Sequence, residues 1–329
     1  CSGAYSCQNR RLAHLQHTST PELTAARAKA RTLPPAAPAH TLGEWAGSCL
    51  ALTKPRVTLL VVLTAVAACY VGADTALGWQ LLAKLAVGTG LLAGGTAALN
   101  QLWERRTDAL MSRTMARPLP AGKLKPPPAA LFGGVTIAAG AALLAWGINW
   151  PCAYWGLATS AVYLLAYTPL KFTSPISTLI GALPGAGPIL MGWAAARGGL
   201  DAGAWILFGI QFLWQFPHFL AIAWLYKEQY ERAGIRMLPV VDENGSETSR
   251  QVLLYTLALI PVSLLPSLIG LTGRLYFVGA LVLGCGFLYA SLKSVRAKTR
   301  KSYRGLLRAS VIYLPLLFGL MAYDRLFHP

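Results

Sequence analysis

Three oxygen-bearing side chains recur at intervals of four residues after a long apolar run. The run covers 79–99, and Asn100, Glu104 and Asp108 follow it. On a helix this spacing places the three side chains on one face, spread over about 12 Å. Carboxylate and amide oxygens suit a magnesium ion, so we interpret Asn100, Glu104 and Asp108 as catalytic, metal-ligating residues. The competing interpretation is a solvated helix end whose acids pair with its own arginines.

Basic side chains follow this first acidic cluster. Arg113 and Arg117 come next in the sequence, and a guanidinium group can bind two oxygens of a diphosphate at once. Lys171 is the one basic residue between the fourth and fifth apolar runs. It either meets the same diphosphate or marks the membrane boundary. This combination of residues indicates a site for a phosphorylated substrate.

A second acidic cluster, after the sixth apolar run, contains Lys227, Glu228, Tyr230 and Glu231. An even number of apolar runs separates the two clusters, so we expect both on the same side of the membrane. Acidic clusters from different helices can hold metal ions against one diphosphate. Taken alone, the second cluster is better explained as a surface helix with an ion pair between Lys227 and Glu231.

His218 follows Gln215-Phe-Pro217 inside the sixth apolar run. An ionisable side chain at membrane depth is a functional-site hypothesis by default. The imidazole would ligate a haem iron or donate a hydrogen bond to a propionate. A lone histidine is also readily satisfied by its neighbours inside a helix bundle, and the spacing alone favours that interpretation.

Membrane-spanning helices must position these residues. Of the 329 residues, 55% are apolar and 12% are charged, which is too little charge for a soluble protein of this length. Apolar runs of membrane-spanning length recur along the chain. We therefore predict an all-α, polytopic membrane protein with about nine transmembrane helices. The predicted spans are about 57–73, 79–99, 129–148, 151–170, 175–196, 202–225, 251–271, 275–292 and 306–323.

The net charge of +17 is distributed in alternate segments between the predicted spans. This is the positive-inside pattern, which places the amino terminus in the cytoplasm, or in the matrix of a mitochondrion. Nucleic-acid binding is excluded because it needs basic residues gathered in one folded patch. The basic segments are Arg10 to Arg56, Arg105 to Lys125, Lys171, Lys227 to Arg250 and Lys293 to Arg308, whereas the others hold only Arg197, Arg274 and Arg325.

Residues 1–41 differ from the rest of the chain. They are polar and rich in Ala, Pro, Ser and Thr. We predict a disordered or targeting segment at 1–41 and a transmembrane domain at 42–329. Because no apolar secretory signal and no clear amphipathic transit helix is visible, we expect the inner (plasma) membrane of a bacterium. The mitochondrial inner membrane is the alternative.

The motif Asn100-x3-Glu104-x3-Asp108-x4-Arg113-x3-Arg117 resembles the first acidic motif of the UbiA-type intramembrane prenyltransferases. The resemblance runs from about residue 45 to residue 325. Within the family the chain looks most like the branch that acts on haem, which its Pro-His-Phe and Met-Leu-Pro motifs separate from quinone and chlorophyll prenyltransferases. Other matching segments are Thr53-Lys-Pro-Arg56, Tyr167-Thr-Pro-Leu-Lys171, Gly181-Ala-Leu-Pro-Gly185, Gln215-Phe-Pro-His-Phe219 and Ala233-Gly-Ile-Arg-Met-Leu-Pro-Val240.

The resemblance implies a UbiA-like helix bundle around a central cavity. It also implies transfer of a farnesyl group from farnesyl diphosphate to a vinyl group of haem B, with addition of water. The product would be haem O, for haem A and terminal oxidase biogenesis. The implied cofactor is Mg²⁺, and the implied partners are the two substrates, the lipid bilayer, and a haem A synthase or oxidase assembly proteins.

Site roles also follow from the resemblance. Asn100, Glu104 and Asp108 would hold magnesium on the diphosphate, and Glu228 would stand for the second acidic motif. The basic residues expected to bind the diphosphate are Arg113, Arg117, Lys171 and Lys227.

Three aromatic side chains, His218, Tyr167 and Tyr230, are candidates for contact with haem. The sequence also departs from the family pattern near its motifs. Gln229 stands where an Asp is common, which keeps an oxygen ligand but loses its charge. Phe172 stands where a second basic residue is expected.

Two other functions stay open at this point. One is prenyl transfer to another aromatic acceptor, such as a quinone precursor. The other is transport along a pathway of intramembrane polar residues. Transport is disfavoured because the acidic residues gather at one face of the membrane rather than at mid-depth.

Overall fold

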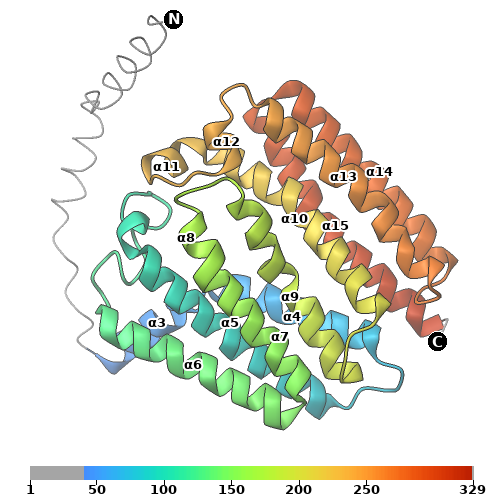
Figure 1. The fold of residues 1–329 in the computed structure, drawn as a ribbon, viewed down its shortest axis with the longest axis horizontal. Coiled ribbons are helices and arrows are strands. Elements are labelled where there is room, and N and C mark those ends of the chain that lie inside the picture. The colour runs from blue at the N-terminus through green and yellow to red at the C-terminus, as the bar shows by residue number, and fades with distance from the viewer. Residues whose placement is uncertain (1–40, 328–329) are drawn as a thin grey trace, which may run out of the picture.

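The computed structural model describes residues 41–327, which form a bundle of helices without strands (Figure 1). The predicted segment 1–41 lies outside the described residues except for Thr41. The helices are α3 (Leu42–Leu52), α4 (Pro55–Gly72), α5 (Trp79–Asp108), α6 (Pro126–Gly147), α7 (Trp150–Ala161), η1 (Val162–Tyr167), α8 (Thr168–Leu170), α9 (Ser177–Arg197), α10 (Ala202–Leu225), α11 (Lys227–Arg232), α12 (Leu238–Val241), α13 (Ser246–Leu268), α14 (Arg274–Ala297) and α15 (Arg300–Phe327).

Eight helices in the described range are long and apolar enough to cross a membrane: α4, α5, α6, α9, α10, α13, α14 and α15. This confirms the predicted all-α membrane bundle. The ninth predicted span, 151–170, is helical but not uniform, because the π-helix η1 separates α7 from α8. A π-helical turn inside a helix commonly marks a functional site, and η1 carries Tyr163 and Tyr167 toward the bundle interior.

Small residues allow the helices to pack closely. A side-chain carbon added to Gly95 of α5 would lie 2.6 Å from the carbonyl oxygen of Gly133 of α6. Similarly, a carbon added to Gly192 of α9 would overlap the backbone of Ala65 of α4. Membrane helices associate through such close backbone contacts because lipid tails offer no hydrophobic driving force between them. The contact between α4 and α9 encloses the interior of the bundle.

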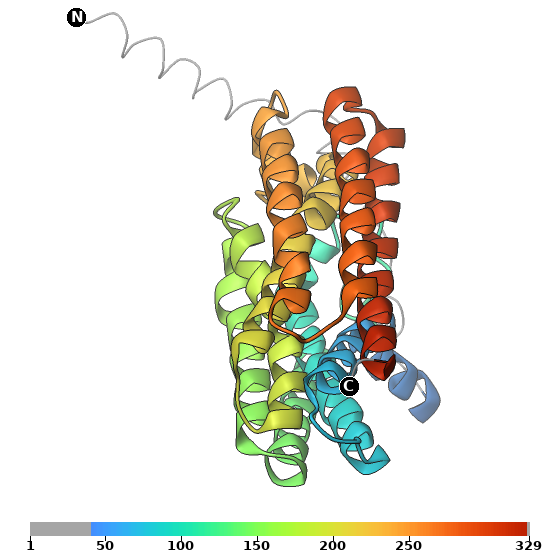
Figure 2. The ribbon, with the colours of Figure 1, turned by 90° about the vertical axis from the view of Figure 1, so that its right-hand side faces the viewer.

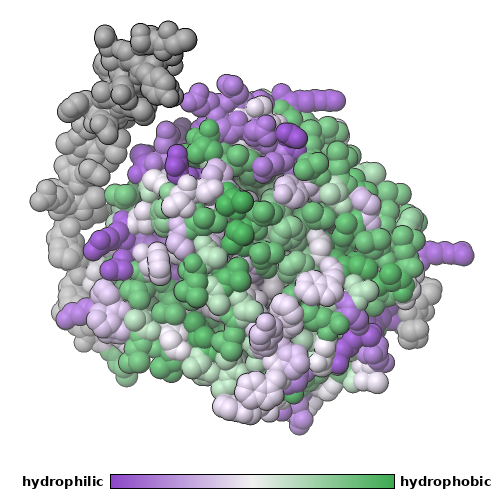
Figure 3. Space-filling model, viewed as in Figure 1, coloured by the Kyte–Doolittle hydropathy of each residue, from purple (hydrophilic) through white to green (hydrophobic). Residues whose placement is uncertain are grey.

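The two long polar connections lie at the same end of the bundle (Figures 1 and 2). The first joins α5 to α6, and the second contains α11 and α12. They touch through a 3.3 Å hydrogen bond from Arg113 to the Tyr230 hydroxyl. The Arg236 backbone N–H also donates to the Lys171 carbonyl at 2.8 Å. We call this the polar end. Figure 3 shows hydrophilic residues gathered over α11 and α12 and a hydrophobic belt below them.

Candidate active site

The last turns of α5 bury the first acidic motif at the polar end. Asn100, Glu104 and Asp108 are 0%, 8% and 1% exposed, whereas Trp103, at the edge of the same face, is 54% exposed. Four-residue spacing therefore places the three oxygen donors on one buried face, as the sequence predicts. A buried carboxylate destabilises a fold strongly unless it is paired, so other segments must supply partners.

Lys171, directly after α8, pairs with Glu104. Its ammonium lies 2.7 Å from Glu104 Oε1 and 4.3 Å from the centre of the Tyr167 ring. Burial alone lowers the pKa of Lys171, but Tyr167 and Glu104 outweigh burial and raise this pKa above its ordinary value. Lys171 therefore brings a positive charge, paired with Glu104, into the site.

Arg117, from the α5–α6 connection, pairs with Asp108. The Arg117 Nη1 atom donates to Asp108 Oδ2 at 2.7 Å. The connection between α5 and α6 is also hydrogen-bonded to the end of α5, because the Thr114 hydroxyl donates to the Asp108 carbonyl at 2.8 Å. Charge-assisted bonds of this kind are stronger than neutral ones, so Asp108 orders the loop that carries Arg117.

Lys54 is the third cation. Its ammonium donates to Asn100 Oδ1 at 2.9 Å, while the Asn100 amide nitrogen donates to Thr168 Oγ1 at 3.1 Å. Lys54 directly precedes Pro55 and has a φ of 49°, in the left-handed region. Such a backbone conformation is costly for a residue with a side chain and is found preferentially at functional sites. Burial lowers the pKa of Lys54 to about 8.

An apolar cavity of about 300 Å³ lies next to these pairs and is lined by Lys54, and by Tyr167, whose ring lies against the Lys171 ammonium. The helices α4, α5, α7, α9 and α10 supply its walls. The α9 residues that line it include Gly181 and Gly185, where an added carbon would collide with the Tyr167 ring and with the Gln215 side chain, so glycine lets these two side chains pack against α9. The site therefore combines a cluster of buried charged pairs at the polar end with an apolar cavity that meets this cluster at Lys54 and Tyr167.

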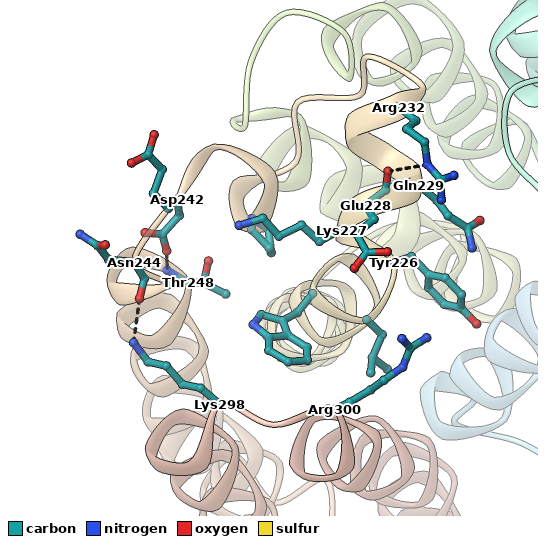
Figure 4. A pocket seen from close by; sticks show the side chains of 15 residues that line it. Tyr226, Lys227, Glu228, Gln229, Arg232, Asp242, Asn244, Thr248, Lys298 and Arg300 are labelled. Atoms are coloured by element: carbon teal, nitrogen blue, oxygen red, sulfur yellow. Dashed lines mark hydrogen bonds between the residues drawn. The ribbon is translucent and has the colours of Figure 1, made fainter. Parts of the chain in front are cut away.

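The second acidic cluster lines a different cavity, of about 420 Å³, formed by α11, the α12–α13 connection and the α14–α15 connection (Figure 4). Glu228 and Lys227 both line it, opposite Lys298 and Arg300. No residue lines both this cavity and the apolar one. Within residues 41–327 no three Asp, Glu, His or Cys side chains are grouped to hold a metal ion. Metal ligation by Glu228 therefore stays a prediction.

Arg113 and Tyr230 connect the two regions. The Arg113 guanidinium carbon lies 5.1 Å from the centre of the Tyr226 ring and 5.9 Å from that of Tyr230. The Tyr230 side chain is buried with Met111 and Ile235 in a small apolar cluster at the polar end. Arg113 is thus held by the rings of Tyr226 and Tyr230, and it ties the α5–α6 connection to α11.

Comparison with known proteins identifies the fold and family. Residues 61–312 match the UbiA prenyltransferase family. The chain belongs to this family. It is similar to a protoheme IX farnesyltransferase of Solibacter usitatus, with 49% identity over 283 residues that cover 83% of this chain and 97% of the relative. Another relative with that name, from Koribacter versatilis, is 46% identical over 83% of this chain and 92% of its own length.

Solved structures support the same fold for this UbiA prenyltransferase. A digeranylgeranylglyceryl phosphate synthase superposes with a TM-score of 0.72 at 16% identity, over 84% of this chain and 97% of that one. A UbiA homolog from Archaeoglobus fulgidus bound to DMAPP and Mg²⁺ gives 0.63 at 14% identity, over 83% and 99%. At these identities the likeness shows the fold alone.

His218 is a residue of α10 in this prenyltransferase, and its side chain contacts α15. It lines neither of the two cavities described above. Its Nδ1 atom is 2.8 Å from Ser310 Oγ. Its ring is stacked on Trp214, with centroids 4.8 Å apart and planes at 22°. Trp214 in turn donates to the Ser310 carbonyl at 2.8 Å. These contacts join α10 to α15, and contact of His218 with haem stays a prediction.

Lys54 received no role in the sequence analysis, although its segment matched a family motif. The sequence feature that could have identified Lys54 is its position directly before a proline at the start of an apolar run. Proline at the first helical position fixes where α4 begins. It therefore also fixes the lysine at the polar end, but only the packing of α4 against α5 brings that lysine to Asn100.

Proposed function

We propose that this chain transfers a farnesyl group from farnesyl diphosphate to a vinyl group of haem B, with addition of water, giving haem O. The observation that carries the proposal is the pairing of each buried residue of the first acidic motif with a cation at the polar end, next to an apolar cavity that one of these cations, Lys54, lines. A prenyl diphosphate has the matching form, with a charged head and an apolar tail. The relatives' shared name, protoheme IX farnesyltransferase, supports haem B as the acceptor.

The cations would stabilise the leaving group. Lys54, Lys171 and Arg117 converge on the first motif from three different segments, where their positive charges would face the oxygens of a diphosphate held at that motif. As the carbon–oxygen bond breaks, its electron pair goes to the diphosphate. Fixed positive charges that face this developing charge lower the barrier most, because they need no reorganisation during the reaction.

The apolar interior would protect the other product of ionisation. Loss of diphosphate leaves an allylic cation, which water would capture. Walls formed by α4, α5 and α9 exclude water from the tail. The π electrons of the haem vinyl group form the new carbon–carbon bond. Water then adds to the cation left on the porphyrin side and loses a proton, so that a hydroxyl group remains.

We further propose Mg²⁺ as the cofactor. The residues that would hold it are Asn100, Glu104 and Asp108, since they offer the hard oxygen ligands that magnesium prefers. Their buried positions on one helix face fit this role. Their present cation partners show that the donor oxygens point toward positive charge. When bound, magnesium would neutralise negative charge on the diphosphate.

The proposed location is the inner membrane of a bacterium with the polar end in the cytoplasm, since the basic segments gather there. The mitochondrial inner membrane is the alternative. We also propose a haem A synthase or oxidase assembly proteins as partners, because the product would pass to them within the membrane.

A direct test is to incubate membranes that contain the protein with haem B and farnesyl diphosphate, with and without magnesium. Mass analysis of extracted porphyrins should then reveal a hydroxyethylfarnesyl haem only in the complete reaction. A parallel incubation with a quinone precursor tests the second candidate function. A prenylated quinone precursor without prenylated haem would overturn the proposal.

A further inference from the structure

The apolar cavity ends on tightly packed side chains. The lining residues furthest from the polar end along α5 and α9 are Thr89 and Leu92 of α5 and Met191 of α9, which are only 1%, 2% and 1% exposed. A carbon added to Gly156 would lie 3.0 Å from Met191 Cε and 3.1 Å from Leu92 Cδ1. These two side chains therefore close the cavity against α7. We call Leu92 and Met191 the floor.

Buried apolar side chains pack directly against the floor. Leu92 and Met191 belong to a buried apolar cluster that continues through Leu85, Cys69 and Cys152. Each of those three residues is 0% exposed. Interiors packed at this density resist insertion of additional methylene groups. A substrate tail that reaches the floor must stop there or leave the cavity sideways.

The depth of the cavity matches a particular tail length. Asn100, whose partner Lys54 lines the cavity, and Thr89, the lining residue furthest from Asn100 on α5, are eleven positions apart. At 1.5 Å per residue this corresponds to about 16 Å. The main chain of a farnesyl group, drawn as an extended zigzag of bonds of roughly 1.5 Å, is on the order of 14 Å long. One more isoprene unit would exceed the depth.

We infer that Leu92 and Met191 determine the chain length of the prenyl donor, by stopping a farnesyl tail at its third isoprene unit. This inference rests on the proposed function, because it takes the cavity to be the site of the prenyl tail. A shorter geranyl tail would leave the space near the floor unfilled. It would therefore bury less apolar surface than a farnesyl tail. A longer geranylgeranyl tail would collide with the floor.

The test compares geranyl, farnesyl and geranylgeranyl diphosphate as donors to haem B for four proteins: the unmodified chain, Met191→Ala, Leu92→Ala and Met191→Phe. We expect the unmodified chain to prefer farnesyl diphosphate. Truncation at either floor position should raise kcat/KM for geranylgeranyl relative to farnesyl diphosphate at least tenfold. Enlargement in Met191→Phe should shift the preference toward geranyl diphosphate.

A matched control is Met321→Ala, which truncates a methionine that is also 1% exposed but lies in the other large core cluster. It should reduce stability without changing donor preference. Equal use of geranylgeranyl and farnesyl diphosphate by the unmodified chain, or unchanged donor ratios in all floor variants, would overturn the inference. Either result would mean that the tail does not end at Leu92 and Met191.

Binding of the three diphosphates in the absence of any acceptor separates this inference from the proposed function. Protection against thermal unfolding in detergent is a suitable readout. Chain-length selectivity in binding that follows the floor variants, without any prenylated haem, would refute the acceptor while supporting the floor. Prenylated haem formed equally well with every donor would refute the floor while supporting haem B as the acceptor.

Discussion

The Lys171 ammonium lies 2.7 Å from Glu104 Oε1, although the two residues are 67 positions apart. Both side chains are almost fully buried, at 9% and 8% exposure. Removal of one partner from a buried ion pair leaves an uncompensated charge and costs far more than loss of a surface pair. This pair thus joins α8 to α5 and also holds a charge ready for the substrate.

Lys171→Ala should therefore lower the free energy of unfolding by about 3–5 kcal/mol, as measured by denaturant unfolding in detergent. The double variant Lys171→Met with Glu104→Gln should recover much of that loss, because neither charge stays unpaired, but should stay inactive. The control is Arg250→Ala at the exposed pair Arg250–Glu247, 3.8 Å long, where we expect at most about 1 kcal/mol. Equal losses at both pairs would contradict this argument.

Replacement of the motif oxygens should abolish catalysis while the fold survives. We expect Asn100→Ala and Asp108→Ala each to lower kcat by roughly a hundredfold or more. Asp108→Asn should also raise the magnesium concentration needed for half-maximal rate. Product formation is measured by mass analysis of porphyrins, and retained haem binding is checked by absorbance. Full activity in either alanine variant would refute the metal assignment.

The lowered pKa of Lys54 predicts that kcat/KM for the prenyl donor depends on pH. Burial lowers its pKa to about 8, so its positive charge is lost as pH rises through 8. We expect kcat/KM for farnesyl diphosphate, which reports the free enzyme, to fall above that pH. Lys54→Arg should remove this decline because arginine stays charged.

The same lysine has the opposite effect on stability. Its folded pKa lies below the ordinary value of 10.5, so the unfolded chain binds more protons between about 8 and 10.5. The contribution of this group to stability therefore rises with pH in that window. A decline in both activity and stability from pH 8 upward would point to general unfolding instead of loss of the Lys54 charge.

Glu228 and Gln229 test the placement of the second acidic motif. We expect Glu228→Ala to reduce kcat/KM for farnesyl diphosphate more than Gln229→Ala does, since only Glu228 brings a negative charge. The control is Glu243→Ala, which changes another acid that lines the same cavity. The reverse order of effects would show that the second motif is assigned to the wrong residue.

His218→Ala should lower stability more than it changes haem binding. The substitution removes the contact with Ser310 and the stacking on Trp214, and we expect a loss of about 1–3 kcal/mol. The Soret band of the haem-loaded protein should stay unchanged. A shifted or weakened Soret band with normal stability would instead identify His218 as a haem ligand.

Local periodicity was sufficient to predict most of the architecture. Apolar runs of membrane length predicted the spans, because in lipid every backbone polar group must be satisfied within its own helix. The four-residue spacing likewise predicted that Asn100, Glu104 and Asp108 share one face of a helix. The π-helical interruption at η1 was not predictable in this way, since its residues are as apolar as an ordinary helix.

By itself, the sequence determined which side chains can carry chemistry and which end of the bundle they occupy. Only the tertiary structure decided their partners, which pair Lys54 with Asn100 and Lys171 with Glu104. It also placed Glu228 in a different cavity from the one that Lys54 lines. It also decided the depth of the apolar cavity and the packing of His218 against α15. The physical reason is that spacing along a helix is fixed by its backbone geometry, whereas contacts between helices depend on how their small residues allow them to pack.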